Sequence, residues 1–252
     1  MVEKKAVLNQ SVERMLRIVE DMAAHGRCRL QDIAERVNLP PSTVLRMINT
    51  LRQYGYAAQE SQAGLYFLTL KFVQLGEAII SKTSLHGVTR AELQRLVKVC
   101  DESCSVGIEQ GGEVVYVDVL DRPDGILKTT QRIGKIAPLH TTGIGKMLLL
   151  NYSEEQIRER YLRTKLTRLT PNSIGTVDDL LAELRKVREL GYALDNEECE
   201  LGVRCVAMAI RDGAGKVVAG ISISGPVHRM TDKHIQQHLP ALEQAVAAIE
   251  RF

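Results

Sequence analysis

One short stretch of the chain carries side chains that could hydrogen-bond to the edges of DNA bases. At helical spacing, four polar residues fall on one face of a predicted helix: Ser42, Arg46, Asn49 and Gln53. The opposite face of that helix is apolar and carries Val44, Ile48 and Leu51. An ordinary helical hairpin with a solvated polar face is one interpretation of this pattern, and DNA binding by the polar face is the functional one.

The residue types on the polar face divide into two kinds of DNA contact. Arginine can bind guanine through two hydrogen bonds, and asparagine can do the same with adenine. We therefore predict that Arg46 and Asn49 read bases. Serine, threonine and arginine side chains also bind phosphates, which position a protein on the duplex. We predict this second role for Ser42, Thr43 and Arg52.

The segments around this helix predict the fold that would present it to DNA. Apolar residues at helical spacing indicate a preceding helix that Asn38-Leu-Pro-Pro41 interrupts, and Ser42 is the predicted N-cap of the second helix. Residues 57–69 have the pattern of a hairpin around Ser61-Gln-Ala-Gly64. A helix-turn-helix followed by a hairpin is the winged form, whose second helix enters the major groove.

The charge of the first 70 residues gives this hypothesis little support by itself. They contain nine Lys and Arg residues against seven Asp and Glu residues. Because phosphate neutralisation supplies much of the affinity for DNA, a weakly basic module needs a second copy to bind well. Residues 70–84 form a predicted helix that is too apolar to stand alone. We therefore expect at least a homodimer that reads an inverted repeat in double-stranded DNA.

The bulk composition is that of a soluble globular protein. The 252 residues are 44% hydrophobic and 25% charged, with a net charge of +2. No apolar run approaches the roughly 20 residues of a membrane span, and the N-terminus lacks an apolar signal region. Five cysteines without a disulfide-framework spacing indicate reduced thiols. We therefore expect a cytoplasmic protein with no membrane segment.

The remainder of the chain alternates helices with strands. Gln110-Gly-Gly112 is a hairpin turn signal between two predicted strands, and Ser153 with Gln156 forms a predicted capping box. Further strands are predicted over 126–131, 192–194, 202–211 and 217–224. Antiparallel hairpins with helices at both ends indicate an α+β domain built on one central sheet.

Two groups of residues in this half could hold an anion. Gly143-Ile-Gly145 opens an apolar helix, where backbone amides attract a carboxylate or phosphate; a tight loop-to-helix junction is an equally good interpretation. Ser222 and Ser224 place two hydroxyls on one face of an apolar strand, where a polar ligand or backbone carbonyls would satisfy them. Cys199 and Cys205 lack zinc-finger spacing, and we expect neither a metal nor a cofactor.

Together, these stretches resemble the IclR family of bacterial transcriptional regulators. Residues 29–56 are similar to the family's helix-turn-helix, and residues 64–70 to its second wing strand. Residues 139–146 and 195–205 match signatures of its effector domain. The family fold divides the chain into a winged helix-turn-helix over 1–69, a linker helix over 70–86 and a GAF-like effector domain over 87–252. The resemblance also implies dimers that can pair into tetramers.

The resemblance assigns an effector site as well. In members that respond to small acids, six positions hold the ligand, and the matching residues here are Gly143, Ile144, Asp195, Cys205, Ser222 and Ser224. The glyoxylate-responsive repressors of the allantoin pathway and the 2-keto-3-deoxygluconate repressors share this pattern. The resemblance therefore implies a repressor of a catabolic operon that senses a small carboxylate, either a 2-oxo acid or a sugar acid.

A thiol hydrolase is the competing function. His140, Asp195 and Cys205 are residue types from which such an enzyme could be assembled. No nucleophile-elbow sequence supports it, and Cys205 lies in a predicted buried strand, where a small core residue is the ordinary interpretation. We therefore expect a regulator with no catalytic residues.

Overall fold

The computed structural model describes residues 9–60, 64–80, 86–122 and 131–251. The chain forms two compact units, which divide between Lys82 and Thr83. The first unit has one cluster of buried apolar side chains, and the second has a cluster on each face of its sheet.

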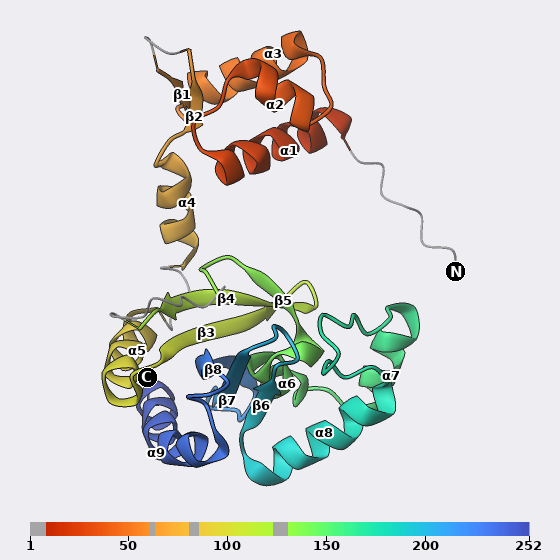
Figure 1. The fold of residues 1–252 in the computed structure, drawn as a ribbon, viewed down its shortest axis with the longest axis vertical. Coiled ribbons are helices and arrows are strands. Elements are labelled where there is room, and N and C mark those ends of the chain that lie inside the picture. The colour runs from red at the N-terminus through yellow and green to blue at the C-terminus, as the bar shows by residue number, and fades with distance from the viewer. Residues whose placement is uncertain (1–8, 61–63, 81–85, 123–130, 252) are drawn as a thin grey trace. The chain divides into compact units, whose positions relative to one another are not determined.

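The first unit consists of helices and a small hairpin (Figure 1). Its helices are α1 (Gln10–His25), α2 (Leu30–Arg36), α3 (Pro41–Gln53) and α4 (Lys71–Ile80). Its strands β1 (Ala57–Gln59) and β2 (Tyr66–Leu68) pair antiparallel. The predicted winged helix-turn-helix is confirmed, although residues 61–63 of the predicted turn lie outside the described residues.

The start of α3 differs from the prediction. The sequence predicts Ser42 as the N-cap, but the helix begins at Pro41 and its N-cap is Pro40. Proline suits the first position of a helix because it has no N–H to leave unpaired and its φ is already helical. The prediction was wrong for Ser42, whose exposed side chain belongs to the first turn. Before α3, Asn38 turns the chain with a left-handed φ of 53°, which asparagine tolerates.

One apolar cluster fixes the orientation of α3. The helix buries Val44, Met47, Ile48 and Leu51. These side chains share a cluster with Ile18 and Met22 of α1 and Ile33 of α2. Because residues three and four apart share a helix face, burying this stripe leaves the polar stripe of α3 outside.

The start of α4 is anchored to the end of α3. The Phe72 ring lies 5.0 Å from the Tyr56 ring, measured between centroids. Lys71 donates a hydrogen bond of 2.7 Å to the carbonyl oxygen of Tyr54 and lies over the Tyr56 ring. The helix that leaves the hairpin therefore begins at a fixed position on the winged module.

The second unit is a six-stranded antiparallel sheet covered by helices. Its strands are β3 (Ser103–Gln110), β4 (Glu113–Leu120), β5 (Ile136–Pro138), β6 (Ala193–Asn196), β7 (Val203–Arg211) and β8 (Val217–Pro226). Its α-helices are α5 (His86–Cys100), α6 (Gly143–Leu149), α7 (Glu154–Arg163), α8 (Val177–Leu190) and α9 (Asp232–Ile249). The strand order is β5-β4-β3-β8-β7-β6, and the predicted α+β class is confirmed.

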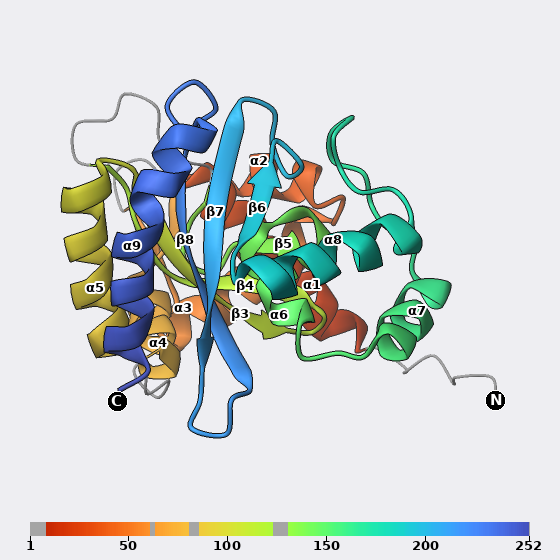
Figure 2. The same ribbon diagram turned by 90° about the horizontal axis from the view of Figure 1, so that it is seen from below.

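The helices divide between the two faces of the sheet. Figure 2 shows α5 and α9 side by side on one face, where they enclose an apolar core. On the other face, α6 contacts the strands from β4 across to β6 because the sheet curls around it. α8 packs behind α6 and completes a second apolar core.

The local predictions for this unit were mostly confirmed. Gly111 and Gly112 form the turn between β3 and β4, and both have positive φ. Ser153 and Gln156 form the predicted capping box of α7. The predicted strand over 126–131 falls outside the described residues except for Gln131, which is not in a strand. The short edge strand β5 was not predicted.

Glycines allow α6 to lie directly on its neighbours. A Cβ added at Gly145 would lie 2.1 Å from the carbonyl oxygen of Leu139. Added Cβ atoms at Gly107 and Gly220 of the sheet would lie 3.2 and 2.9 Å from the Ile144 side chain. Side chains at these positions would push the helix away from the concave face, so the glycines set the depth at which α6 sits.

We expect Gly145→Ala to destabilise the second unit by about 1–3 kcal/mol, because the new methyl group meets a backbone atom that cannot move aside. Urea denaturation followed by circular dichroism measures the change. Gly213→Ala is the control, because its added Cβ meets nothing within 4 Å and its φ is not left-handed. Equal stability of the two variants would contradict the close approach of α6.

Candidate functional site

The polar face of α3 is open to solvent. Ser42, Arg46, Asn49 and Arg52 are exposed, and Thr43 is half-buried. The five residues therefore stand on a rigid helix whose other face is locked into the core. α3 contains no acidic residue, so nothing on the helix itself would repel a phosphate.

Two of these side chains contact each other beside the hairpin. Arg52 donates a hydrogen bond of 3.2 Å to the Asn49 side-chain oxygen, and its guanidinium lies 5.9 Å from the centre of the Tyr66 ring. Arg46, by contrast, makes no side-chain hydrogen bond or ion pair with any residue that the structure describes. Arg52 is thus held toward the hairpin, while the Arg46 guanidinium remains available to a ligand.

The six residues of the predicted effector site lie close together on the concave side of the sheet. Cys205 is paired with Asp195 on β6 and with Ser224 on β8. Ser222 is paired with Ala207, two residues farther along β7. Gly143 packs on the same Ala207, since an added Cβ there would lie 3.0 Å from the alanine Cβ. The pleat and the sheet register bring these distant positions into one neighbourhood.

The two buried serines find partners among other side chains. The hydroxyls of Ser222 and Ser105 share a hydrogen bond of 2.9 Å. The Gln131 amide nitrogen lies 3.4 Å from the Ser224 hydroxyl and 3.4 Å from the Tyr116 hydroxyl. The sequence predicts a ligand or backbone carbonyls as the partners of these serines, and it does not indicate Ser105, Gln131 or Tyr116.

A cavity of about 360 Å³ opens beside these residues. It is lined by Tyr116, Gln131, Lys135, Ile136, Ala137, Pro138, Leu169, Asp195, Cys199, Glu200, Val203 and Cys205. Of the six predicted effector residues, Asp195 and Cys205 line it, and the other four are not among its lining residues. Residues from β5 and β6, the two edges of the sheet, contribute to the same cavity because the sheet curls.

The Asp195 carboxyl group is buried in the wall of this cavity. Its Oδ1 atom accepts hydrogen bonds from the backbone amides of Glu198 (2.8 Å) and Cys199 (3.2 Å). Burial raises the pKa of Asp195 to about 7, although these two amides and the Lys146 charge act in the opposite direction. The side chain therefore changes its charge near neutral pH.

Lys146, to which the sequence assigns no role, is fully buried. Its Nζ atom donates to Glu198 Oε1 at 2.6 Å and to the carbonyl oxygen of Leu194 at 2.7 Å. The ion pair joins α6 to the loop that follows Asp195. The sequence could have indicated this ion pair, because Lys146 lies within the apolar run of α6 and a buried ammonium group requires a partner.

The side chains of the hydrolase alternative are not arranged for catalysis. Burial raises the pKa of the Cys205 thiol well above its usual value, so the thiol is not a nucleophilic thiolate. His140 donates from Nε2 to the carbonyl oxygen of Thr167 at 2.9 Å, and burial lowers its pKa. The carbonyl has no proton to give, so Nε2 carries the N–H in this contact. This alternative is not supported.

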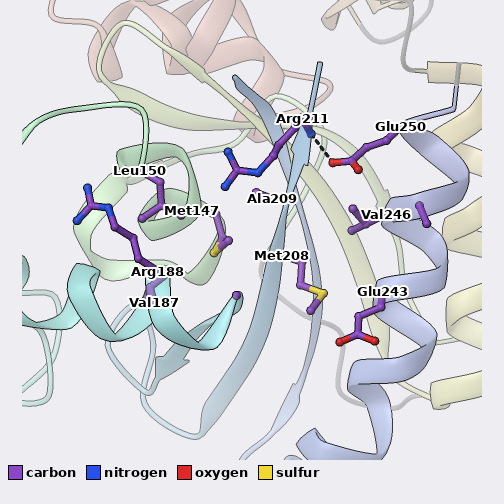
Figure 3. Close-up of a pocket in the computed structure, with 12 residues that line it drawn as sticks. Met147, Leu150, Val187, Arg188, Met208, Ala209, Arg211, Glu243, Val246 and Glu250 are labelled. Atoms are coloured by element: carbon purple, nitrogen blue, oxygen red, sulfur yellow. Dashed lines mark hydrogen bonds between the residues drawn. The ribbon is translucent and has the colours of Figure 1, made fainter. Parts of the chain in front are cut away.

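A larger groove of about 560 Å³ lies elsewhere in the second unit (Figure 3). Met147, Val187, Met208 and Ala209 form its apolar part, and the charged residues around it are Arg188, Arg211, Glu243 and Glu250. Glu250 accepts a hydrogen bond from the backbone amide of Arg211 at the edge of β7. None of the six predicted effector residues lines this groove.

Among the described residues, no group of three or more His, Cys, Asp or Glu side chains is arranged to hold a metal ion. No helix within the described parts of the chain is long and apolar enough to span a bilayer.

Both units match domains of one protein family. Residues 11–61 match the IclR helix-turn-helix domain. Residues 77–251 match the domain described as bacterial transcriptional regulator IclR C-terminal. The chain belongs to the IclR family of bacterial transcriptional regulators. It is therefore a DNA-binding regulator and not an enzyme, and its second unit is the IclR C-terminal domain.

Known IclR-family proteins resemble the chain over nearly its whole length. The KdgR transcriptional regulator of Escherichia coli K12 is 31% identical over 239 residues, which cover 95% of this chain and 90% of KdgR. The AllR transcriptional repressor of the same strain is 34% identical over 230 residues, which cover 90% of this chain and 84% of AllR.

Solved structures of the family have the same fold. The Thermotoga maritima IclR structure has a TM-score of 0.82 at 28% identity and covers 96% of both chains. An IclR homologue from Microbacterium hydrocarbonoxydans, complexed with 4-hydroxybenzoate, has a TM-score of 0.80 at 22% identity. That comparison covers 96% of this chain and 98% of the homologue.

We expect Lys146→Met to destabilise the IclR C-terminal domain by about 3–5 kcal/mol, because it leaves the buried Glu198 carboxylate without its cation. Adding Glu198→Gln should recover part of the loss, because the unpaired charge is then removed. Urea denaturation of the two single variants and the double variant measures the coupling. Arg185→Met, which breaks an exposed ion pair with Glu154, is the control and should have little effect. Strictly additive effects of the two substitutions would contradict the pairing.

Proposed function

We propose that this IclR-family chain is a repressor that binds operator DNA as a dimer and responds to a small carboxylate. The observation that carries the proposal is the presence, in one chain, of an exposed, acid-free α3 face and a cavity whose mainly apolar lining includes several polar side chains. The first can bind DNA, and the second can hold a small molecule. Such a protein acts where bacterial DNA lies, in the cytoplasm.

Exposed apolar side chains support the dimer. Val12 and Leu16 of α1 are each 55% exposed, and Val73 and Leu75 of α4 are 52% and 45% exposed. Large apolar side chains gathered on one module favour contact with another protein surface. A symmetric dimer presents two α3 helices, so its operator would be an inverted repeat with half-sites about 34 Å apart. A further pairing into tetramers would use the C-terminal domains.

Two relatives support repression and a carboxylate ligand. AllR carries the name of a transcriptional repressor. The Microbacterium homologue holds 4-hydroxybenzoate, which is a carboxylate. The cavity volume of about 360 Å³ lies in the range of small-molecule sites. A 2-oxo acid is the effector class we favour over a sugar acid.

In this proposal the six predicted residues surround the effector. The backbone amides of Gly143 and Ile144 and the hydroxyls of Ser222 and Ser224 would hydrogen-bond to its oxygens, and Cys205 would form the floor. Their common position on the concave face supports this arrangement. Asp195 would contribute mainly through its backbone.

We expect Arg46→Ala to weaken operator binding by about 1–3 kcal/mol and to relax the preference at one base pair, because a bidentate base contact is lost. An operator selected from random oligonucleotides by the wild-type protein, and its single-base variants, would be titrated by fluorescence anisotropy. Arg158→Ala, on α7 of the other unit, is the control and should leave DNA affinity unchanged. Equal weakening on every sequence would assign Arg46 to phosphate binding instead.

We expect Ser222→Ala combined with Ser224→Ala to weaken effector binding about tenfold or more, because each hydrogen bond to a charged ligand contributes about 1.5–3 kcal/mol. Calorimetric titration with a panel of 2-oxo acids measures the change. DNA affinity without effector should stay nearly constant. Ser153→Ala, which removes only the cap of α7, is the control. Unaltered affinity in the double variant would remove both serines from the site.

A further inference from the structure

Only one of the two oxygens of the Asp195 carboxyl group accepts hydrogen bonds from residues that the structure describes. Oδ1 accepts the two backbone amides of Glu198 and Cys199. Oδ2 makes no hydrogen bond with any residue in the described parts of the chain, although the side chain is only 3% exposed and lines the cavity. A carboxyl oxygen that has no partner in the protein, on a side chain that lines a cavity, is a group that a ligand can complete.

The charges around Asp195 do not neutralise it fully. The ionisable side chains that influence its carboxyl group, or share the cavity with it, are Lys146 of α6, Glu198, Cys199 and Glu200 of the following loop, Cys205 of β7, Tyr116 of β4 and Lys135 before β5. Lys146 is already paired with Glu198 at 2.6 Å. An anion that enters the cavity therefore meets a carboxyl group on which one cationic influence, Lys146, is already paired with another acid.

We propose that Asp195 carries a proton when the effector is bound and donates it from Oδ2 to an oxygen of the effector anion. The inference rests on the proposed function, in which the cavity holds a small carboxylate. It assigns the Asp195 side chain a direct part in recognition, as an uncharged hydrogen-bond donor to the effector.

Electrostatics gives the reason. Two carboxylates in contact at a buried site cannot both remain ionised, because their repulsion is weakly screened there, and one of them takes up a proton. Asp195 is the better acceptor of that proton, since its pKa already stands at about 7. A free 2-oxo acid is a stronger acid than an ordinary carboxylic acid, so it stays ionised.

The protonation of Asp195 determines the direction in which effector affinity changes with pH. Below about pH 6, Asp195 is protonated before the effector arrives, and affinity should not change with pH. Above pH 7 the free side chain is ionised, so each binding event must take up one proton from solution. Affinity should then fall by up to about tenfold for each pH unit.

The experiment titrates the full-length protein with pyruvate by calorimetry at about pH 6.0, 7.0, 8.0 and 8.5, values that lie on both sides of the Asp195 pKa of about 7. At pH 8.0 it is repeated in two buffers with different ionisation enthalpies, which gives the number of protons taken up without any variant. Asp195→Asn retains an oxygen for the two backbone amides and places an N–H donor at the position of Oδ2. Glu200→Gln is the matched control, since it removes another carboxylate of the same cavity.

The expected result is uptake of close to one proton at pH 8.0 and a falling wild-type affinity. Asp195→Asn should bind pyruvate with an affinity that does not change with pH and that exceeds the wild-type value at pH 8.5. Glu200→Gln should keep the wild-type pH profile. Two results would overturn the role of Asp195 as proton donor and leave the carboxylate effector in place. One is a wild-type affinity that does not change with pH and involves no proton uptake. The other is loss of pyruvate binding at every pH in a folded Asp195→Asn variant. If neither pyruvate nor 4-hydroxybenzoate binds the wild-type protein at any pH, the carboxylate effector itself is wrong and the inference falls with it.

Discussion

The buried ion pair between Lys146 and Glu198 is the interaction on which the cavity of the C-terminal domain depends. It joins α6, at the centre of the curled sheet, to the loop that carries one wall of the cavity. Removing two charges from water is costly, and additional hydrogen bonds must offset that cost. Here the carbonyl oxygen of Leu194 and the backbone amide of Asn196 supply them. The loop geometry around Asp195 is thus set by groups that are not among the lining residues of the cavity.

The sequence predicts well those parts of the molecule in which periodicity decides the structure. In α3, the apolar stripe that contains Val44 and Ile48 had to be buried, so the polar stripe with Arg46 had to face outward. The capping box at Ser153 and the turn at Gly111-Gly112 rely on local hydrogen bonds and backbone conformation, and both are present. Such features are encoded within a few residues, so the surrounding fold did not alter them.

The features that the sequence did not predict depend on contacts between distant segments. β5 is three residues long and is a strand only because β4 supplies its partner. Gln131 reaches the Ser224 hydroxyl across 93 positions of the chain, and no spacing rule connects the two residues. The cavity itself arises from sheet curvature, which a list of strands does not contain. The error at Ser42 has a different origin. Pro41 and Ser42 are adjacent and both are common at helix N-termini, and in the structure Pro41 is the first residue of the helix.

The curled sheet has a consequence for mechanics. Its order places β5 and β6 at opposite ends of the strand ladder, yet residues of both line the same cavity. The sheet is in this respect an incomplete barrel with an unsealed seam, and the backbone leaves that seam without a ladder of hydrogen bonds among the described residues. A molecule held in the cavity touches both sides of the seam at once. It would link the two edge strands, which the hydrogen bonds of the sheet do not join directly.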